Sequence, residues 1–386
     1  MMPEEHECPP AEFLPEVTMA DRERIALVHD YWVTVRGGER IFLGLARLFP
    51  QADCFALIPD PALGSGSQQP FAIRTTALQW IPNGYRHFRA LLPLYPLAAR
   101  CLDLRGYDLV ISSSSGFCHG IRANGVHVCY CHSPLRYAWN EFDATIRRQR
   151  TPLGRAALSG VLRYVRHMDF AAAQRVSQYV ANSRTVQQRI ASNYDRQSVI
   201  VHPFVDTARF RPSDVVDDYF LVVSQLLPYK RVDLAIQACN RLRRRLLVVG
   251  DGPERPALER MAGPSVSFLG RVSEGDLTAL YARSAALLQC GEEDFGMATL
   301  EAQASGRPAI AFKTGGAAET VLHERTGLHI PEQTVECVLE ALAQFNSMKF
   351  DTPDLLAHAE RFNEAHFRSA MRQVVRDTGL DLKVGL

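Results

Sequence analysis

Short apolar runs alternate with longer amphipathic stretches along most of the chain. In the first half, residues 25–28 form an apolar run, followed by a glycine pair and a helical pattern with apolar residues at 41, 42, 45 and 48. Further apolar runs of this half, each predicted to be a strand, are residues 109–111, 126–130, 179–181 and 199–201. Buried strands that alternate with helices predict a parallel sheet covered on both faces.

The pattern pauses at residues 211–218, which are mostly polar and contain three Asp. It then restarts, with a helix from Val232 and strands at residues 219–223, 246–249, 266–269, 285–288, 309–312 and 328–330. The chain therefore predicts two Rossmann-like α/β domains joined near residue 214. Because ligands of such sheets bind at the carboxyl ends of the strands, we expect a site in the cleft between the domains.

The predicted division of the chain has four parts. Residues 1–22 are expected to be a disordered extension, 23–213 an N-terminal domain, and 214–357 a C-terminal domain. Residues 358–386 carry a helical apolar stripe, which we expect to be structural. A stretch of Gly, Ser, Gln and Pro at 64–70 is interpreted as an exposed insertion without a function of its own.

Composition and charge narrow the class of protein. Hydrophobic residues make up 47% and charged residues 22% of the 386 residues, which is typical of a globular chain. The 43 Lys and Arg balance 42 Asp and Glu, so no overall field attracts nucleic acid. No run of about eighteen apolar residues predicts a membrane-spanning helix. Residues 1–20 contain five Glu and no Lys or Arg, unlike a signal peptide, and we expect a cytoplasmic protein.

The nine cysteines are scattered and odd in number, which favours a reducing compartment. Cys129 and Cys131 lie next to His132, but no further ligands follow at short spacing. We therefore interpret these cysteines as buried structural thiols rather than a zinc site. No other metal is expected, because the sequence has no Asp-x-Asp site, and no further cofactor is expected.

The most informative stretch runs from Glu293 to Pro308. Gly296 allows a close approach of the backbone to a ligand, and a helix is expected to begin there and to run to Ser305. Its N-terminal amides and positive dipole end suit a phosphate group. Glu293 before the helix and Glu301 two turns inside it are carboxylates that can accept hydrogen bonds from sugar or ribose hydroxyls.

This stretch resembles the Glu-x7-Glu signature, with an internal Phe-Gly, of the retaining family-4 glycosyltransferases. Their fold is GT-B, with two Rossmann-like domains whose parallel sheets face a central cleft. The resemblance covers roughly residues 24 to 378 and rests on an ordered set of landmarks. Besides residues 293–301, these are 228–233, 249–254, 268–271, 315–319 and 326–327.

The resemblance implies a role for each matching residue. Glu301 is expected to accept from the ribose and Glu293 from hydroxyls of the transferred sugar. Lys230 is expected to contact the diphosphate, although it could instead be a solvated lysine after a proline turn. Of the remaining donor-site residues, Phe295, Gly296 and Met297 would offer amides to the sugar, Ala298 and Thr299 would meet the diphosphate, and Gly270 and Arg271 would border the nucleobase. For Glu319, a site role and a structural role remain open.

Gln225 departs from the family pattern. The family commonly has an arginine at this place, five residues before the lysine, and an amide supplies no charge to a diphosphate. Either Arg231 or Arg271 substitutes for the missing cation, or phosphate binding is weaker than in relatives.

Residues of the first half are candidates for the acceptor side. By resemblance, the loop of Gly37 and Gly38 faces the donor diphosphate, although a simple turn explains the glycines equally well. His132 follows a predicted strand and should project into the cleft, where a family histidine touches the transferred sugar. Arg136 and His119 are weaker candidates on this side, and Ser112 to Ser115 are interpreted as a turn.

Two arginine-rich segments without acidic residues lie at 84–100 and 146–168. An amphipathic basic surface can rest on an anionic membrane leaflet, and acceptors of this family are often lipid-linked. An ordinary solvated helix face explains these segments equally well. By resemblance, the last helix of the chain crosses back onto the first domain.

The resemblance implies a retaining glycosyltransferase that moves a sugar from a nucleotide diphosphate to a hydroxyl of a glycan or lipid-linked glycan. Residues 130–136 and 228–233 look most like mannosyltransferases that use GDP-mannose in surface-polysaccharide assembly. His132, Glu293 and Lys230 are the predicted catalytic residues. The alternatives are a nucleotide-sugar epimerase of the same architecture and a non-catalytic nucleotide-sugar-binding protein.

Overall fold

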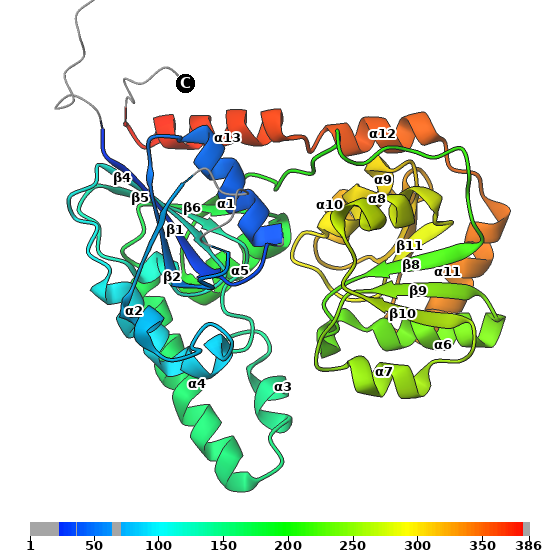
Figure 1. The fold of residues 1–386 in the computed structure, drawn as a ribbon, viewed down its shortest axis with the longest axis horizontal. Helices are drawn as coiled ribbons and strands as arrows, with labels where there is room; N and C mark the ends of the chain where they lie inside the picture. The colour runs from blue at the N-terminus through cyan, green and yellow to red at the C-terminus, as the bar shows by residue number, and fades with distance from the viewer. Residues whose placement is uncertain (1–22, 36, 64–70, 381–386) are drawn as a thin grey trace, which may run out of the picture.

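The computed structural model describes residues 23–35, 37–63 and 71–380, and in these ranges the chain forms two α/β domains (Figure 1). The predicted extension at 1–22 and the predicted insertion at 64–70 lie outside the described residues. Each domain is built on a parallel sheet, in the order β3-β2-β1-β4-β5-β6-β7 for the first and β10-β9-β8-β11-β12-β13 for the second. The predicted fold class of two parallel-sheet domains is confirmed.

The first sheet is buried between two groups of helices. One face packs against α1 and α13 through Ile41, Phe42 and Met371, and the other against α2 and α4 through Tyr95 and Val165. The strands are β1 (Ile25–Trp32), β2 (Asp53–Pro59), β3 (Ile73–Thr75), β4 (Leu109–Ser114), β5 (Val126–Cys131), β6 (Gln178–Ala181) and β7 (Ser198–Ile200). The helices are α1 (Gly37–Leu48), α2 (Tyr95–Cys101), α3 (Phe142–Arg147), α4 (Pro152–Ala173) and α5 (Arg184–Tyr194). Strands β2 and β3 are absent from the sequence prediction.

The second sheet is also covered on both faces. Helices α6 and α11 pack on one face, and α8, α9 and α12 on the other. The strands are β8 (Tyr219–Val223), β9 (Arg245–Val249), β10 (Val266–Gly270), β11 (Ala286–Gln289), β12 (Ala309–Phe312) and β13 (Gly327–Ile330). The helices are α6 (Val232–Leu242), α7 (Arg255–Met261), α8 (Glu274–Arg283), α9 (Met297–Ala304), α10 (Ala317–Thr320), α11 (Val335–Ser347) and α12 (Thr352–Glu360).

The last two helices run along one side of both domains (Figure 1). Helix α12 packs against α9 of the second domain, whereas α13 (Glu364–Asp377) packs against α1 of the first. Phe367, Met371 and Val375 on α13 are buried in the first domain's core. The chain therefore returns to the first domain between residues 360 and 364, and α13 joins the two halves.

The structure corrects one local prediction. Ser112 to Ser115 were expected to form a turn, but β4 continues to Ser114, and Ser112 to Ser114 are buried. Their hydroxyls are hydrogen-bonded to three histidines in turn, in the pairs Ser112–His127, Ser113–His132 and Ser114–His119. A polar strand is stable here because each hydroxyl has a buried partner.

Candidate active site in the interdomain cleft

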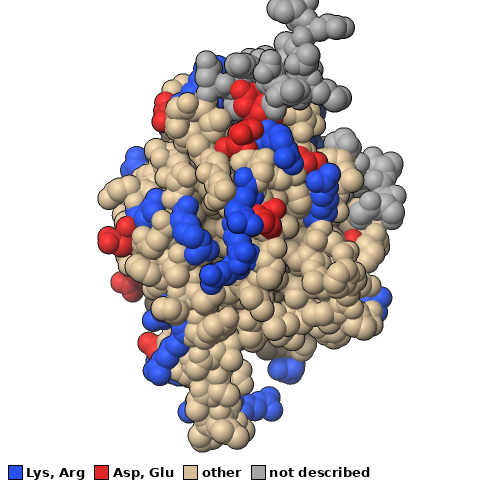
Figure 2. Space-filling view, turned by 90° about the vertical axis from the view of Figure 1, so that its left-hand side faces the viewer, with Lys and Arg blue, Asp and Glu red and all other residues tan. Residues whose placement is uncertain are grey.

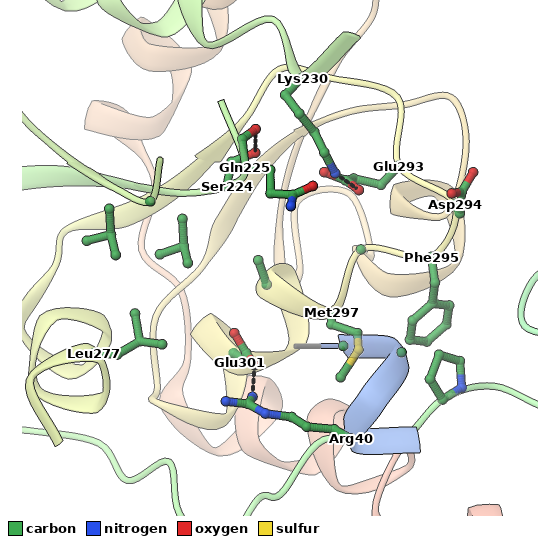
Figure 3. A pocket seen from close by; sticks show the side chains of 18 of the residues that line it. Arg40, Ser224, Gln225, Lys230, Leu277, Glu293, Asp294, Phe295, Met297 and Glu301 are labelled. Atoms are coloured by element: carbon green, nitrogen blue, oxygen red, sulfur yellow. Dashed lines mark hydrogen bonds and ion pairs between the residues drawn. The ribbon is translucent and has the colours of Figure 1, made fainter. Parts of the chain in front are cut away.

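A cavity of about 500 Å³ lies between the domains, where the carboxyl ends of both sheets meet. The first domain contributes residues that follow β1, β5 and β6, and the second contributes residues that follow β8, β9 and β11. Figure 3 shows Arg40 on α1 pointing across the cavity toward α9, with Lys230 and Glu293 on the far side. The predicted site residues that line the cavity are Gly37, Gly38, His132, Gln225, Lys230, Arg271, Glu293, Phe295, Gly296, Met297, Ala298 and Glu301.

Helix α9 begins at the cavity wall because Gly296 reverses the chain there. Gly296 has φ +90°, a conformation that other residues rarely adopt, and an added Cβ would lie 3.2 Å from Nε2 of Gln289. The hydroxyl of Thr299 donates to the Gly296 carbonyl at 2.6 Å and lies 2.8 Å from Thr320 Oγ1. Thr299 is thus buried beneath the helix start, and Met297 and Ala298 are the residues of the first turn that line the cavity.

Lys230 and Glu293 form an ion pair on the cavity wall. Lys230 ends a short 3-10 turn, Pro228–Lys230, after β8, and Glu293 lies in the loop between β11 and α9. Burial opposes the charge on Lys230, but Glu293 outweighs it, and the net effect raises the pKa of Lys230. The lysine is therefore charged at neutral pH, and a bound anion would compete with Glu293 for it.

Glu301 is 7% exposed and accepts two hydrogen bonds, from the Tyr281 hydroxyl at 2.7 Å and from Arg40 Nη1 at 3.1 Å. Burial raises the pKa of Glu301, while Arg40 and Tyr281 counteract this shift. Arg40 also pairs with Glu274 at 2.8 Å, so its guanidinium joins the two domains. Nothing in the sequence marks Arg40 as a site residue except its place beside the glycine pair.

His132 directly follows β5 and lines the cavity. Its Nε2 is 2.8 Å from Ser113 Oγ, which also lies 3.1 Å from Nδ1 of His29. Burial, and then the neighbouring His29, lower the pKa of His132 to about 3, so its imidazole is neutral at physiological pH. His29 and Ser113 are supporting residues that sequence reasoning missed.

The two glycines that precede Arg40 allow α1 to approach this wall. A Cβ on Gly38 would lie 3.5 Å from Nε2 of His132, and one on Gly37 would lie 3.1 Å from the sulfur of Met297. The start of α1 therefore faces the start of α9 across the cavity. Larger side chains at either position would narrow the space between the two helix ends.

Four predicted site residues do not line the cavity. Arg231 pairs at 3.1 Å with Asp233 in the first turn of the adjacent helix α6, while Arg271 does line the cavity. Arg136 lies over the Tyr229 ring, 4.2 Å from its centroid, and donates to the Glu292 carbonyl at 3.4 Å. Arg136 thus bridges the domains outside the cavity wall. The other two of the four are Gly270 and Thr299.

Further predictions concern metals, thiols and membranes. In the part of the chain that the structure describes, no three His, Cys, Asp or Glu side chains are grouped to hold a metal ion. Cys129 and Cys131 are buried in the first domain, and burial raises the pKa of both thiols. Within the same described ranges, no helix is both long and apolar enough to cross a membrane.

Comparison with curated proteins identifies mycobacterial relatives. A stretch of 172 residues is 34% identical to the GDP-mannose-dependent alpha-(1-6)-phosphatidylinositol monomannoside mannosyltransferase of Mycobacterium tuberculosis, covering 37% of this chain and 45% of the relative. The protein of the same name from Mycolicibacterium smegmatis is 32% identical over 192 residues, covering 42% and 50%. The matched region thus spans about half the length of these relatives.

Solved structures share the whole architecture. A sucrose-phosphate synthase from Thermosynechococcus elongatus matches with a TM-score of 0.70 and 18% identity, covering 92% of this chain and 99% of that one. HepE from Anabaena, solved in complex with UDP and glucose, matches with a TM-score of 0.68 and 16% identity, covering 92% and 100%. At these identities the likeness shows a shared fold.

Two family models match successive parts of the chain. Residues 35–209 match the model described as Glycosyltransferase Family 4, and residues 207–365 match the model described as Glycosyl transferases group 1. Together they extend from the start of α1 into α13. The resemblance inferred from the motifs is confirmed, and the chain belongs to the family-4 and group-1 glycosyltransferases of GT-B fold.

Proposed function

We propose that this protein is a retaining mannosyltransferase that moves mannose from GDP-mannose to a hydroxyl of a glycan or lipid-linked glycan. The observation that carries the proposal is the convergence of the α9 start, the Lys230–Glu293 pair and Glu301 on one cavity. The names of the mycobacterial relatives support the choice of GDP-mannose and of a lipid-linked acceptor.

In this proposal the bound donor replaces existing ion-pair partners of the side chains that line the cleft. The diphosphate lies at the amides of Met297 and Ala298 and takes the place of Glu293 beside Lys230. Glu293 then accepts from hydroxyls of the sugar. The ribose hydroxyls reach Glu301 as Arg40 withdraws, and Arg271 borders the base.

In the proposed reaction, negative charge develops on the phosphate oxygen of the leaving group. The bond between the sugar's anomeric carbon and the phosphate oxygen breaks, and the acceptor oxygen bonds to that carbon on the same face. The departing phosphate oxygen takes the acceptor's proton. Lys230 and the α9 amides stabilise the charge on the leaving group, and neutral His132 hydrogen-bonds to the sugar. These groups are proposed to act without a metal, and the enclosed cleft limits attack by water.

Transfer from labelled GDP-mannose to a phosphatidylinositol mannoside acceptor tests the proposal, with the product anomer read by NMR. Glu293→Gln and Lys230→Met should each lower kcat/KM by about 100-fold or more, the scale for removing a group that stabilises transition-state charge. Matched controls are Glu340→Gln and Lys313→Met, which change exposed residues of the same domain. Free epimerised sugar nucleotide without transfer would support the epimerase alternative, and binding without turnover would support the non-catalytic one.

We further propose that the arm formed by α3 and α4 rests on an anionic membrane. Leu153 is 81% exposed, and Tyr164 and Phe170 are also exposed along this arm. Its exposed arginines, none of which has an ion pair within the described structure, are Arg147, Arg148, Arg150, Arg155 and Arg163. Figure 2 shows basic side chains on the face of the N-terminal domain that is turned to the viewer, and on both sides of the lower projection, where the arm lies.

Flotation with vesicles tests the membrane contact. Each basic residue near an anionic surface contributes about 1 kcal/mol, so Arg147→Glu with Arg148→Glu should weaken binding by roughly 30-fold or more. The matched control is Arg245→Glu with Arg260→Glu on the second domain. Equal flotation of both double variants, or equal binding to zwitterionic vesicles, would contradict the proposal.

A further inference from the structure

Arg189 on α5 of the first domain binds the loop of the second domain that carries Glu293. Its Nη1 pairs with the Asp294 carboxylate, and its Nη2 donates to Glu292 Oε1 at 2.7 Å. These two acids are the immediate neighbours of Glu293 in the chain. One guanidinium therefore holds both flanks of the predicted sugar-binding carboxylate.

The same corner of the first domain also holds His132. Arg189 Nη1 donates to the hydroxyl of Ser133 at 3.2 Å, next to His132 in the chain. The amide of Asn182 donates to the His132 carbonyl at 2.9 Å, and Ser183 Oγ donates to the Asp294 carbonyl at 2.5 Å. The β6–α5 corner thus connects the acceptor-side histidine to the donor-side acidic loop.

Arg189 keeps its carboxylate partners only while the two domains are in contact. Arg189 is 7% exposed, whereas Glu292 and Asp294 belong to the opposite domain. A buried guanidinium without carboxylate partners is strongly destabilised, so its pairing favours the arrangement in which the domains touch. The two-pronged geometry of the guanidinium also fixes the orientation of the loop.

We propose that Arg189 is a positioning residue that couples contact between the domains to the placement of Glu293 relative to His132. The inference rests on the proposed function. Arg189 is not among the residues that line the cavity, so it acts through the Glu292–Asp294 loop rather than on the donor or acceptor. Its loss should therefore lower the rate of transfer more than the binding of the nucleotide.

Steady-state kinetics and GDP titration of variants test the coupling. GDP lacks the sugar that Glu293 contacts, so Arg189→Met should lower kcat by about 10- to 100-fold while the Kd for GDP changes less than about threefold. Arg189→Lys should recover part of kcat, because an ammonium can pair with one of the two carboxylates. The matched control is Arg184→Met on the same helix, an exposed side chain, which should leave both quantities unchanged.

A second variant removes the carboxylate partners instead of Arg189, so that the test does not depend on whether Arg189→Met folds. Glu292→Gln with Asp294→Asn should lower kcat to a similar extent, and adding Arg189→Met to it should cost little more. The inference is overturned if Arg189→Met retains wild-type kcat. It is also overturned if kcat and GDP affinity fall together, with no recovery in the lysine variant. A wild-type protein that transfers no sugar would instead refute the proposed function.

Discussion

Gln225 lies in the loop that follows β8 and lines the cavity where the family pattern has an arginine. The cations around it are already engaged, because Lys230 pairs with Glu293 and Arg40 pairs with Glu301 and Glu274. Among the described residues that line the cavity, Arg271 is the only cation without an ion pair. The site therefore has little free positive charge, and Gln225→Arg should strengthen its binding of a diphosphate.

The size of the gain follows from one added charged hydrogen bond. A hydrogen bond to a charged group contributes about 1.5–3 kcal/mol net, which corresponds to roughly 10- to 100-fold tighter binding of GDP. The gross Coulomb energy of a charge pair at about 4 Å is about 4 kcal/mol near a protein surface. This energy is larger than the net gain of about 1.5–3 kcal/mol that we expect. Repulsion between the new arginine and Lys230 keeps the net value below that figure.

Isothermal titration with GDP and with guanosine measures the effect. Guanosine has no phosphate, so its Kd should not change, and the gain for GDP should shrink at high salt because ions screen the new charge. Gln225→Met is the matched control for size without charge. An unchanged Kd for GDP, or an equal gain for guanosine, would show that the diphosphate does not lie beside residue 225.

Two further predictions concern buried polar groups. Nε2 of Gln289 is buried beside Gly296 without a hydrogen-bond partner in the described structure. Gln289→Leu should therefore not lower the free energy of unfolding, and it should weaken GDP-mannose binding several-fold because the donor loses the hydrogen bond from this amide. Calorimetry and denaturant unfolding of the same variant would contradict this if stability fell and affinity held. Because the pKa of His132 is depressed from 6.5 to about 3, the unfolded chain binds the extra proton, and stability present above about pH 6.5 is lost as the pH falls toward 3. The loss amounts to about 2 kcal/mol at about pH 5, and His132→Gln should remove that share of the pH dependence in urea titrations; an unchanged slope would refute the assignment.

The sequence predicted best those features that are encoded within one short segment. The loop and helix around Gly296 need only a glycine, a helical pattern and two carboxylates, all within nine residues of Glu293. The prediction of a turn at Ser112 was wrong, because buried histidines from distant segments satisfy the serine hydroxyls and allow a polar strand. Local polarity cannot reveal partners of this kind.

The contacts between the domains could not be predicted from short sequence patterns, because their partners also come from distant segments. Arg40 and Glu301 are 261 positions apart, and Arg189 and Asp294 are 105 apart. The sequence shows each of these as one arginine or one acid among many. Only the return of the chain through α13 and the meeting of the two sheet edges bring them within hydrogen-bonding distance.

These contacts give the cleft a particular charge balance. Each carboxylate proposed to bind a donor hydroxyl is already paired with a cation, Glu293 with Lys230 and Glu301 with Arg40. Donor binding is then an exchange, in which the diphosphate takes Lys230 and releases Glu293 to the sugar. Because one ion pair is broken for each new one formed, the net affinity is smaller than the number of contacts suggests. A donor without its sugar leaves Glu293 without a new partner, and so the complete nucleotide sugar should bind more tightly than GDP alone.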